Sequence, residues 1–125
     1  MFRIAAADAS HFSFDGTDFF GLVAPSRGAS ETAVWRVRVP AGKLSATPHQ
    51  LSRKEILVAV SGTACCSISG EPHELAAGDA LIIPAFTDFA LNNPGDLPFE
   101  AITILPVGGR ALLPDRAPFV PPWAI

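Results

Sequence analysis

The fold is decided by two stretches of the chain, GKLSATPHQLSRKEILVAVSG at residues 42–62 and GDALIIPAFTDFALNN at residues 78–93. Both begin with glycine, which tolerates the positive φ of a tight turn. Each contains an apolar run of strand length, and Pro84 closes the second run because it has no N–H to donate. The two stretches therefore predict short β-strands joined by tight turns.

Turn signals divide the rest of the chain at similarly short intervals. Trp35 and Val37 alternate with Arg36 and Arg38, and this period of two predicts a strand with one apolar face. Further strands are expected at residues 55–60, 63–68, 80–83, 86–91 and 99–105. Because twelve prolines argue against long helices, the expected class is all-β, a sandwich or a barrel.

Length and charge limit the domain count and the partners. A chain of 125 residues fits one domain. Its net charge of -3 comes without any basic run, so neither nucleic acid nor a membrane surface is an expected partner. The apolar runs are too short to span a membrane, and residues 1–10 do not have the pattern of a secretory signal. We therefore expect a cytoplasmic protein.

Composition also bears on assembly and on the thiols. With 49% hydrophobic residues and nine Phe, the chain is more apolar than an average soluble domain, which predicts a homodimer. The Phe-rich segment at residues 12–20 is expected to lie across the partner subunit. Cys65 and Cys66 are adjacent, so their side chains point to opposite faces of a strand, and we expect both to be reduced.

The spacing of the two opening stretches resembles the paired motifs of the cupin family. The agreement lies in Gly42, His49, Glu55 and Gly62 of the first motif and in Gly78, Pro84 and Asn93 of the second. The resemblance implies an all-β double-stranded β-helix, the cupin jelly-roll barrel. It makes residues 1–125 a single cupin domain, with an N-terminal arm (1–30), a barrel core with both motifs (34–105) and a C-terminal tail (106–125).

The resemblance also implies a metal site, which this chain has lost in part. Cupin motifs usually supply three histidines and one glutamate to a metal. Leu51 and Phe89 stand at two of the histidine positions, which leaves only His49 and Glu55. Because a divalent site needs about three or four protein ligands, no cofactor is expected. The alternative is a divalent transition metal held by His49 and Glu55 with one further donor, from His11, His73, Asp88, Cys65 or Cys66.

Hydrocarbon at the lost ligand positions predicts a cavity for a small, largely apolar molecule. The expected lining residues are His49, Leu51, Glu55, Phe86, Phe89 and Trp35. An isolated carboxyl group among apolar side chains is desolvated, so the pKa of Glu55 should rise. A hydrogen bond to His49, or a small ligand shared with it, would relieve that cost. The other interpretation treats both side chains as relics held by packing and water.

Three functions follow from this reading. The first is a metal-free protein that binds a small molecule, which the apolar replacements favour. The second is a metal-dependent enzyme of the dioxygenase or isomerase type. The third is a metal-free isomerase or epimerase with a histidine base, in which Glu55 would have to replace the usual tyrosine acid, since the chain has no tyrosine. The sequence identifies no catalytic residue.

Three further features each allow more than one interpretation. Asn93 precedes a proline and suits hydrogen bonding to the local backbone better than chemistry. Arg36, Arg38 and Arg53 fit a solvated outer face, an intersubunit pair or an anionic group. The Pro-Pro-Trp segment at residues 121–123 would place its indole over the barrel mouth, on another subunit, or in a packed tail.

Overall fold

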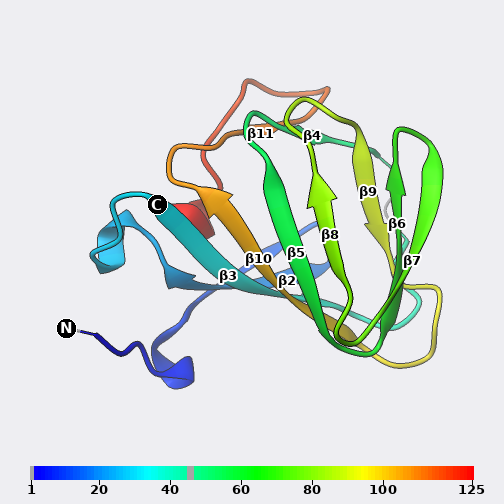
Figure 1. Cartoon of the computed structure of the whole chain (residues 1–125), viewed down its shortest axis with the longest axis horizontal. Helices are drawn as coiled ribbons and strands as arrows, with labels where there is room; N and C mark the ends of the chain where they lie inside the picture. Colours follow the sequence, from blue (N-terminus) through cyan, green and yellow to red (C-terminus); the bar gives the residue numbers. More distant parts are fainter. Residues whose placement is uncertain (1, 45–46) are drawn as a thin grey trace.

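A computed structural model describes residues 2–44 and 47–125 and contains strands, turns and three short 3-10 helices in these ranges (Figure 1). The strands are β1 (Ser10–Phe14), β2 (Thr17–Val23), β3 (Thr32–Val39), β4 (Gln50–Leu51), β5 (Glu55–Ser61), β6 (Thr63–Ile68), β7 (Glu71–Ala76), β8 (Ala80–Ile83), β9 (Phe89–Asn92), β10 (Phe99–Pro106) and β11 (Ala111–Leu112). The 3-10 helices are η1 (Ala6–Asp8), η2 (Pro25–Arg27) and η3 (Pro122–Ala124). The all-β prediction is confirmed. None of the described helices is long and apolar enough to cross a membrane.

The strands form one large and two small antiparallel sheets. The large sheet has the order β1-β2-β3-β10-β5-β8, and the small sheets have the orders β7-β6-β9 and β11-β4. Figure 1 shows the three-stranded sheet standing opposite the end of the large sheet that carries β5 and β8. Because β5 and β6 follow each other without a long connection, the chain passes directly from one wall of the barrel to the other.

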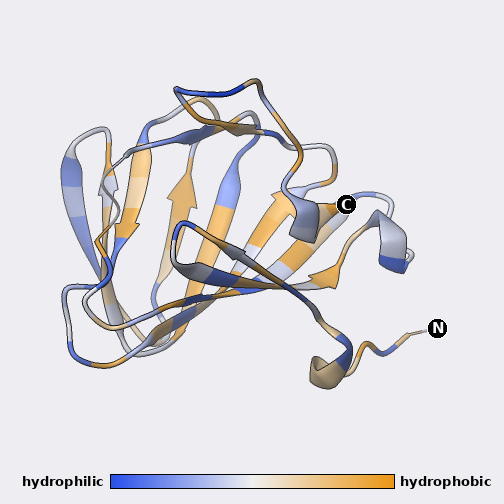
Figure 2. Ribbon diagram, turned by 180° about the vertical axis from the view of Figure 1, so that it is seen from behind, coloured by the Kyte–Doolittle hydropathy of each residue, from blue (hydrophilic) through white to orange (hydrophobic). Residues whose placement is uncertain are grey.

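Alternation along the strands separates the core from the outer face. Trp35, Thr103 and Leu57 lie in one row across β3, β10 and β5, and all three are buried inside the barrel. The next row, Arg36, Ile102 and Val58, points to the outer face. Figure 2 shows the result, with apolar residues concentrated on the strands of the large sheet and polar residues in the connections.

The predicted strands agree with the structure where the apolar pattern is strong. β6 and β8 have the predicted bounds, and β5 and β10 run one residue further than predicted. The strand predicted at 86–91 begins only at Phe89, because Phe86 has a φ of 56° and donates its N–H to Leu51 O at 2.8 Å. That turn ends the connection from β8.

The N-terminal segment does not form the arm that we expected. β1 and β2 form a hairpin whose turn, at Asp15 and Gly16, has positive φ at both residues. β2 then pairs with β3 of the same chain along Asp18 to Val23. Within this chain, the Phe-rich segment therefore extends the barrel's own large sheet.

Two motif residues have structural roles. Gly62 has a φ of 77°, and a Cβ there would collide with the carbonyl oxygen of Pro98, so only glycine fits this turn. The Asn93 amide is fully buried and donates to Val39 O at 3.1 Å and Leu97 O at 2.8 Å. Its Oδ1 accepts from Gly95 N at 3.1 Å. The expectation that Asn93 serves the backbone is confirmed.

Candidate functional site

The barrel interior holds a partly open cavity of about 150 Å³. Its walls come from the inner face of the large sheet, from β4 and β9, and from the C-terminal tail. Six aromatic side chains line it: Phe14, Phe19, Trp35, Phe89, Phe119 and Trp123. The polar or charged residues of the lining are Asp15, Thr17, Lys43, Thr47, His49, Glu55 and Thr103. The site is therefore a mostly apolar, aromatic pocket that also holds several polar groups.

The structure places five of the six predicted lining residues on this cavity. These are His49, Leu51, Glu55, Phe89 and Trp35. Phe86 does not line it, and its side chain is 64% exposed. The prediction was wrong there because the left-handed backbone at Phe86 directs the side chain away from the barrel interior.

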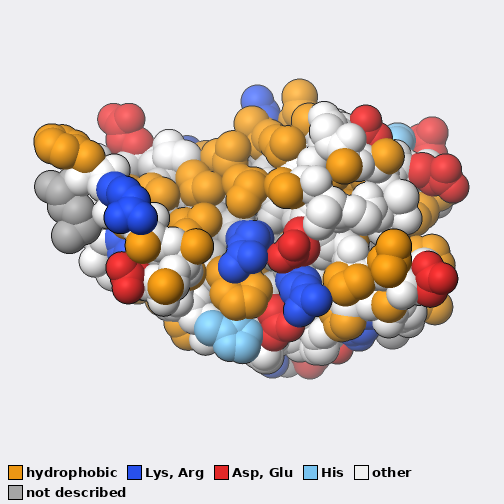
Figure 3. All heavy atoms as spheres, turned by 90° about the horizontal axis from the view of Figure 1, so that it is seen from below, with side chains coloured by type: hydrophobic (Ala, Val, Ile, Leu, Met, Phe, Trp, Pro, Cys, Tyr) orange, Lys and Arg blue, Asp and Glu red, His pale blue; other side chains and the backbone are white. Residues whose placement is uncertain are grey.

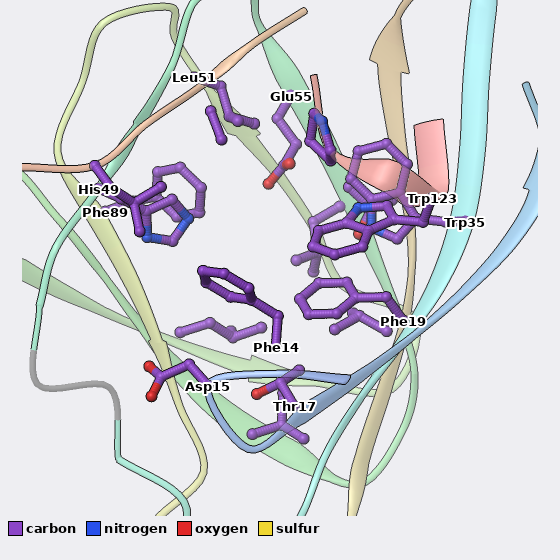
Figure 4. Close-up of a pocket in the computed structure, with 18 of the residues that line it drawn as sticks. Phe14, Asp15, Thr17, Phe19, Trp35, His49, Leu51, Glu55, Phe89 and Trp123 are labelled. Carbon is purple, nitrogen blue, oxygen red and sulfur yellow. The ribbon is translucent and has the colours of Figure 1, made fainter. Parts of the chain in front are cut away.

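His49 and Phe89 lie side by side on the cavity wall (Figure 4). The His49 N–H donates to Phe89 O at 3.0 Å, and the Phe89 N–H donates to His49 O at 2.9 Å. Their ring centroids are 4.3 Å apart. Phe89 thus places a hydrocarbon ring against the imidazole.

Burial lowers the pKa of His49, although the charge of Asp15 and a backbone hydrogen bond at Thr47 act in the opposite direction. The imidazole is therefore neutral at pH 7, since its ordinary value is already 6.5. A neutral imidazole offers one donor and one acceptor.

Glu55 opens β5 opposite Ile83 and points its carboxyl group into the cavity (Figure 4). Glu55 is 6% exposed, and within residues 2–44 and 47–125 its carboxyl group has no hydrogen-bond partner. Burial raises the pKa of Glu55 to about 8, which confirms the expected direction. At neutral pH the group is a carboxylic acid able to donate one hydrogen bond.

The expected direct hydrogen bond between His49 and Glu55 is not formed in the described part of the chain. Desolvation is the only cause of the raised pKa of Glu55, so no neighbouring positive charge stabilises its ionised form. Both side chains nevertheless border the same cavity. A small molecule shared between them stays a prediction.

The donor set does not fit a transition metal. Among the described residues, no group of three or more His, Cys, Asp and Glu side chains comes together. The five additional candidate donors do not line the cavity. His11 bonds to Asp18 at 2.9 Å, and Asp88 accepts from the Gln50 amide at 2.9 Å. Burial raises the pKa of Cys66 to about 12, so its sulfur is a thiol rather than a metal-binding thiolate.

The arginines lie away from the cavity. Arg36 donates to Glu100 at 3.2 Å and covers the ring of Phe20, with 4.4 Å between the guanidinium carbon and the ring centroid. Arg38 and Arg53 are exposed, and none of the three lines the cavity. The structure agrees with the outer-face interpretation.

Sequence reasoning missed several aromatic residues of the site. The sequence predicts an arm for the segment that holds Phe14 and Phe19 and leaves three positions open for Trp123, whereas the structure places all three side chains on the cavity. For Phe14 the sequence contains a short signal, because Phe12 and Phe14 alternate with polar residues, as side chains on one face of a strand do. No local pattern marks the tail, whose position depends on tertiary packing.

Comparison with known proteins decides the family. The family model described as the cupin domain matches residues 35–105, more than half of the chain. The chain is a member of the cupin family. Its first motif places His49, Leu51 and Glu55 on the cavity, and its second motif places Phe89 there.

A curated relative matches about half of this cupin. The mannose-1-phosphate guanylyltransferase of Salmonella muenchen is 37% identical over 71 residues, which are 57% of this chain but only 15% of that enzyme. The chain thus spans a small part of that relative.

Solved structures match more of the chain. The polyketide cyclase RemF from Streptomyces resistomycificus has a TM-score of 0.80 at 14% identity, over 94% of this chain and 87% of that one. A sugar phosphate isomerase of the cupin superfamily from Silicibacter pomeroyi has a TM-score of 0.67 at 20% identity, over 82% and 68%. At such identities the likeness shows the fold alone, and it confirms the cupin jelly roll.

Proposed function

We propose that this cupin binds a small, largely apolar molecule inside its barrel and holds no metal tightly there. The observation that carries the proposal is Glu55, a buried carboxyl group without a partner in the described part of the chain, facing a cavity with mostly aromatic walls. A ligand that accepts its hydrogen bond would satisfy this group, whereas hydrocarbon alone would leave it unpaired.

Cavity size supports a ligand of about the dimensions of benzene. The cavity holds about 150 Å³, and engineered protein cavities of about this size that are lined by apolar side chains admit benzene. The aromatic walls favour a flat ring, since aromatic pairs contribute beyond the area they bury. Most of the ligand surface should be apolar, because most of the lining residues are apolar.

The test is binding of a panel of small aromatic probes, namely benzene, toluene and phenol. Both tryptophans line the cavity, so their fluorescence reports occupancy directly. The matched control is Ala111→Leu, which adds side-chain volume to a cavity wall that is now alanine. Saturable binding that Ala111→Leu weakens would support the proposal. No saturable change with any probe, or equal binding to both proteins, would refute it.

We also propose that the chain forms a homodimer through the outer face of the large sheet. Figure 3 shows a face where apolar side chains gather around a few charged ones. By register, one outward row holds Val34, Ile104, Ile56 and Ile82, and Ile82 is 64% exposed. Covering such a row stabilises a pair of subunits.

Light scattering should give twice the mass of 13.1 kDa, and Ile82→Glu should reduce it toward the monomer. A monomeric wild type would refute this.

A further inference from the structure

Two polar side chains lie next to each other on the inner face of the large sheet. Glu55 and Leu57 belong to the inward row of β5, and Thr103 of β10 lies directly opposite Leu57. Glu55 and Thr103 are therefore diagonal neighbours on one face of an antiparallel pair, a position in which residues are about 7–8 Å apart. Both line the cavity, and they are only 6% and 3% exposed.

The oxygens of these two side chains are unpaired but open to the cavity. Within residues 2–44 and 47–125, neither the Glu55 carboxyl group nor the Thr103 hydroxyl makes a hydrogen bond. In the same ranges, the one fully enclosed side-chain nitrogen or oxygen without a partner is Nε1 of Trp123. The oxygens of Glu55 and Thr103 are therefore not sealed off, and a molecule in the cavity that they line can reach them.

We propose that Glu55 and Thr103 form one oxygen-binding subsite, which holds the carbonyl oxygen of a small cyclic ketone. This inference rests on the proposed function and names the chemical class of its ligand. A carbonyl oxygen has two lone pairs and accepts two hydrogen bonds. Two donors at ordinary hydrogen-bond length from one acceptor lie up to about 5 Å apart, and the length of the Glu55 side chain covers the rest of the separation.

Both groups are able to donate to such an oxygen. The Thr103 hydroxyl rotates to suit its acceptor. The Glu55 carboxyl group keeps its proton at neutral pH, because burial raises its pKa to about 8. A pure hydrocarbon would leave both groups unpaired, which is unfavourable for buried oxygens. The hydrocarbon ring of a ketone would lie against the aromatic walls, with its oxygen toward β5 and β10.

The test compares cyclohexanone with methylenecyclohexane, which has a CH₂ group in place of the carbonyl oxygen, by calorimetry. The measured quantity is the ratio of the two affinities, compared between wild type and variant, so that the different hydration of the probes cancels. Thr103→Val removes the hydroxyl and keeps the shape, and Glu55→Met removes both oxygens and keeps the length. Each change should lower the ratio in favour of cyclohexanone by about fivefold.

Two control variants accompany these changes. Thr17→Val makes the same substitution at another lining residue, which Figure 4 shows on the opposite side of the pocket from Glu55. It should affect the two probes alike and leave their ratio unchanged. Glu55→Gln keeps N–H groups that donate, so it should keep most of the ratio that Glu55→Met loses.

The outcomes separate this inference from the proposed function. If either Thr103→Val or Glu55→Met leaves the ratio at its wild-type value, the shared subsite is refuted and the binding cavity stands. The same holds if benzene binds to the wild type and cyclohexanone does not. If benzene, toluene and cyclohexanone all fail to bind, the proposed function fails and the inference falls with it.

A second measurement needs only the wild-type protein. Hydrogen bonds to a carbonyl oxygen weaken the C=O bond, so the infrared stretch of bound cyclohexanone, labelled with ¹³C at the carbonyl carbon, should lie at lower frequency than in hexane. A bound ketone with the frequency found in hexane would overturn the inference.

Discussion

Replacing Glu55 by glutamine should make the protein more stable at neutral and alkaline pH. The native state raises the pKa of this carboxyl group from its ordinary 4.5 to about 8, with burial as the cause. Glutamine has nearly the same shape, stays neutral at every pH and keeps a hydrogen-bond donor. The variant therefore removes the ionisation and preserves the packing.

The sign and size follow from linkage between protonation and folding. Below pH 4.5 both the folded and the unfolded chain keep the Glu55 proton, and the stability contributed by this group is fully present. As the pH rises toward 8 the unfolded chain loses the proton while the folded chain retains it. Stability then falls by about 1.4 kcal/mol per pH unit, which amounts to about 3 kcal/mol between pH 5 and pH 7.

The assay is urea unfolding of wild type and Glu55→Gln at pH 5, 6, 7 and 8, followed by tryptophan fluorescence. The two free energies of unfolding should be similar at pH 5 and should separate in favour of the variant as the pH rises. His49 has a lowered pKa and destabilises the fold as the pH falls through its ordinary value of 6.5, but this effect is common to both proteins and cancels in the difference. Parallel stability curves would show that Glu55 ionises normally and would refute the reasoning.

Two further predictions concern the lost ligands and the buried amide. The double change Leu51→His and Phe89→His places two imidazoles beside His49 and Glu55. Calorimetry should then detect stoichiometric Zn²⁺ binding to the variant and none to the wild type. If the double variant does not bind Zn²⁺, the four side chains do not converge on one point of the cavity. Asn93→Ala removes three hydrogen bonds to backbone groups and should lower the free energy of unfolding by about 3 kcal/mol, without changing probe affinity. A loss below about 0.5 kcal/mol would contradict the structural role of Asn93.

The barrel core was predictable because its sequence signals are local. Period-two alternation at Trp35 and Val37 predicts which side chains face inward, and the register of β3 and β10 agrees. Gly62 and Asn93 belong to turns whose requirements are set within a few residues. Such features depend on backbone geometry and are readable from one chain.

The rest of the site depends on packing between distant segments. Trp123 meets Phe19 across more than 100 residues of sequence, and no local rule brings them together. Phe86 stands where the family often has glycine and was predicted to line the cavity, but its backbone has a positive φ and the residue is 64% exposed. The predicted hydrogen bond between His49 and Glu55 assumed that two residues on the same cavity wall are also in contact. In the structure both side chains line the cavity, but they do not bond to each other.

The metal content of the purified protein tests whether the barrel holds a transition metal. Cells should be grown with added iron, manganese, nickel and zinc, and the protein analysed by mass spectrometry of its metals after gel filtration. Because only His49 and Glu55 remain as donors beside Leu51 and Phe89, we expect far less than one equivalent of any transition metal, and probe binding that a chelator does not change. One tightly held equivalent, lost together with probe binding after chelation and absent from Glu55→Gln, would contradict it.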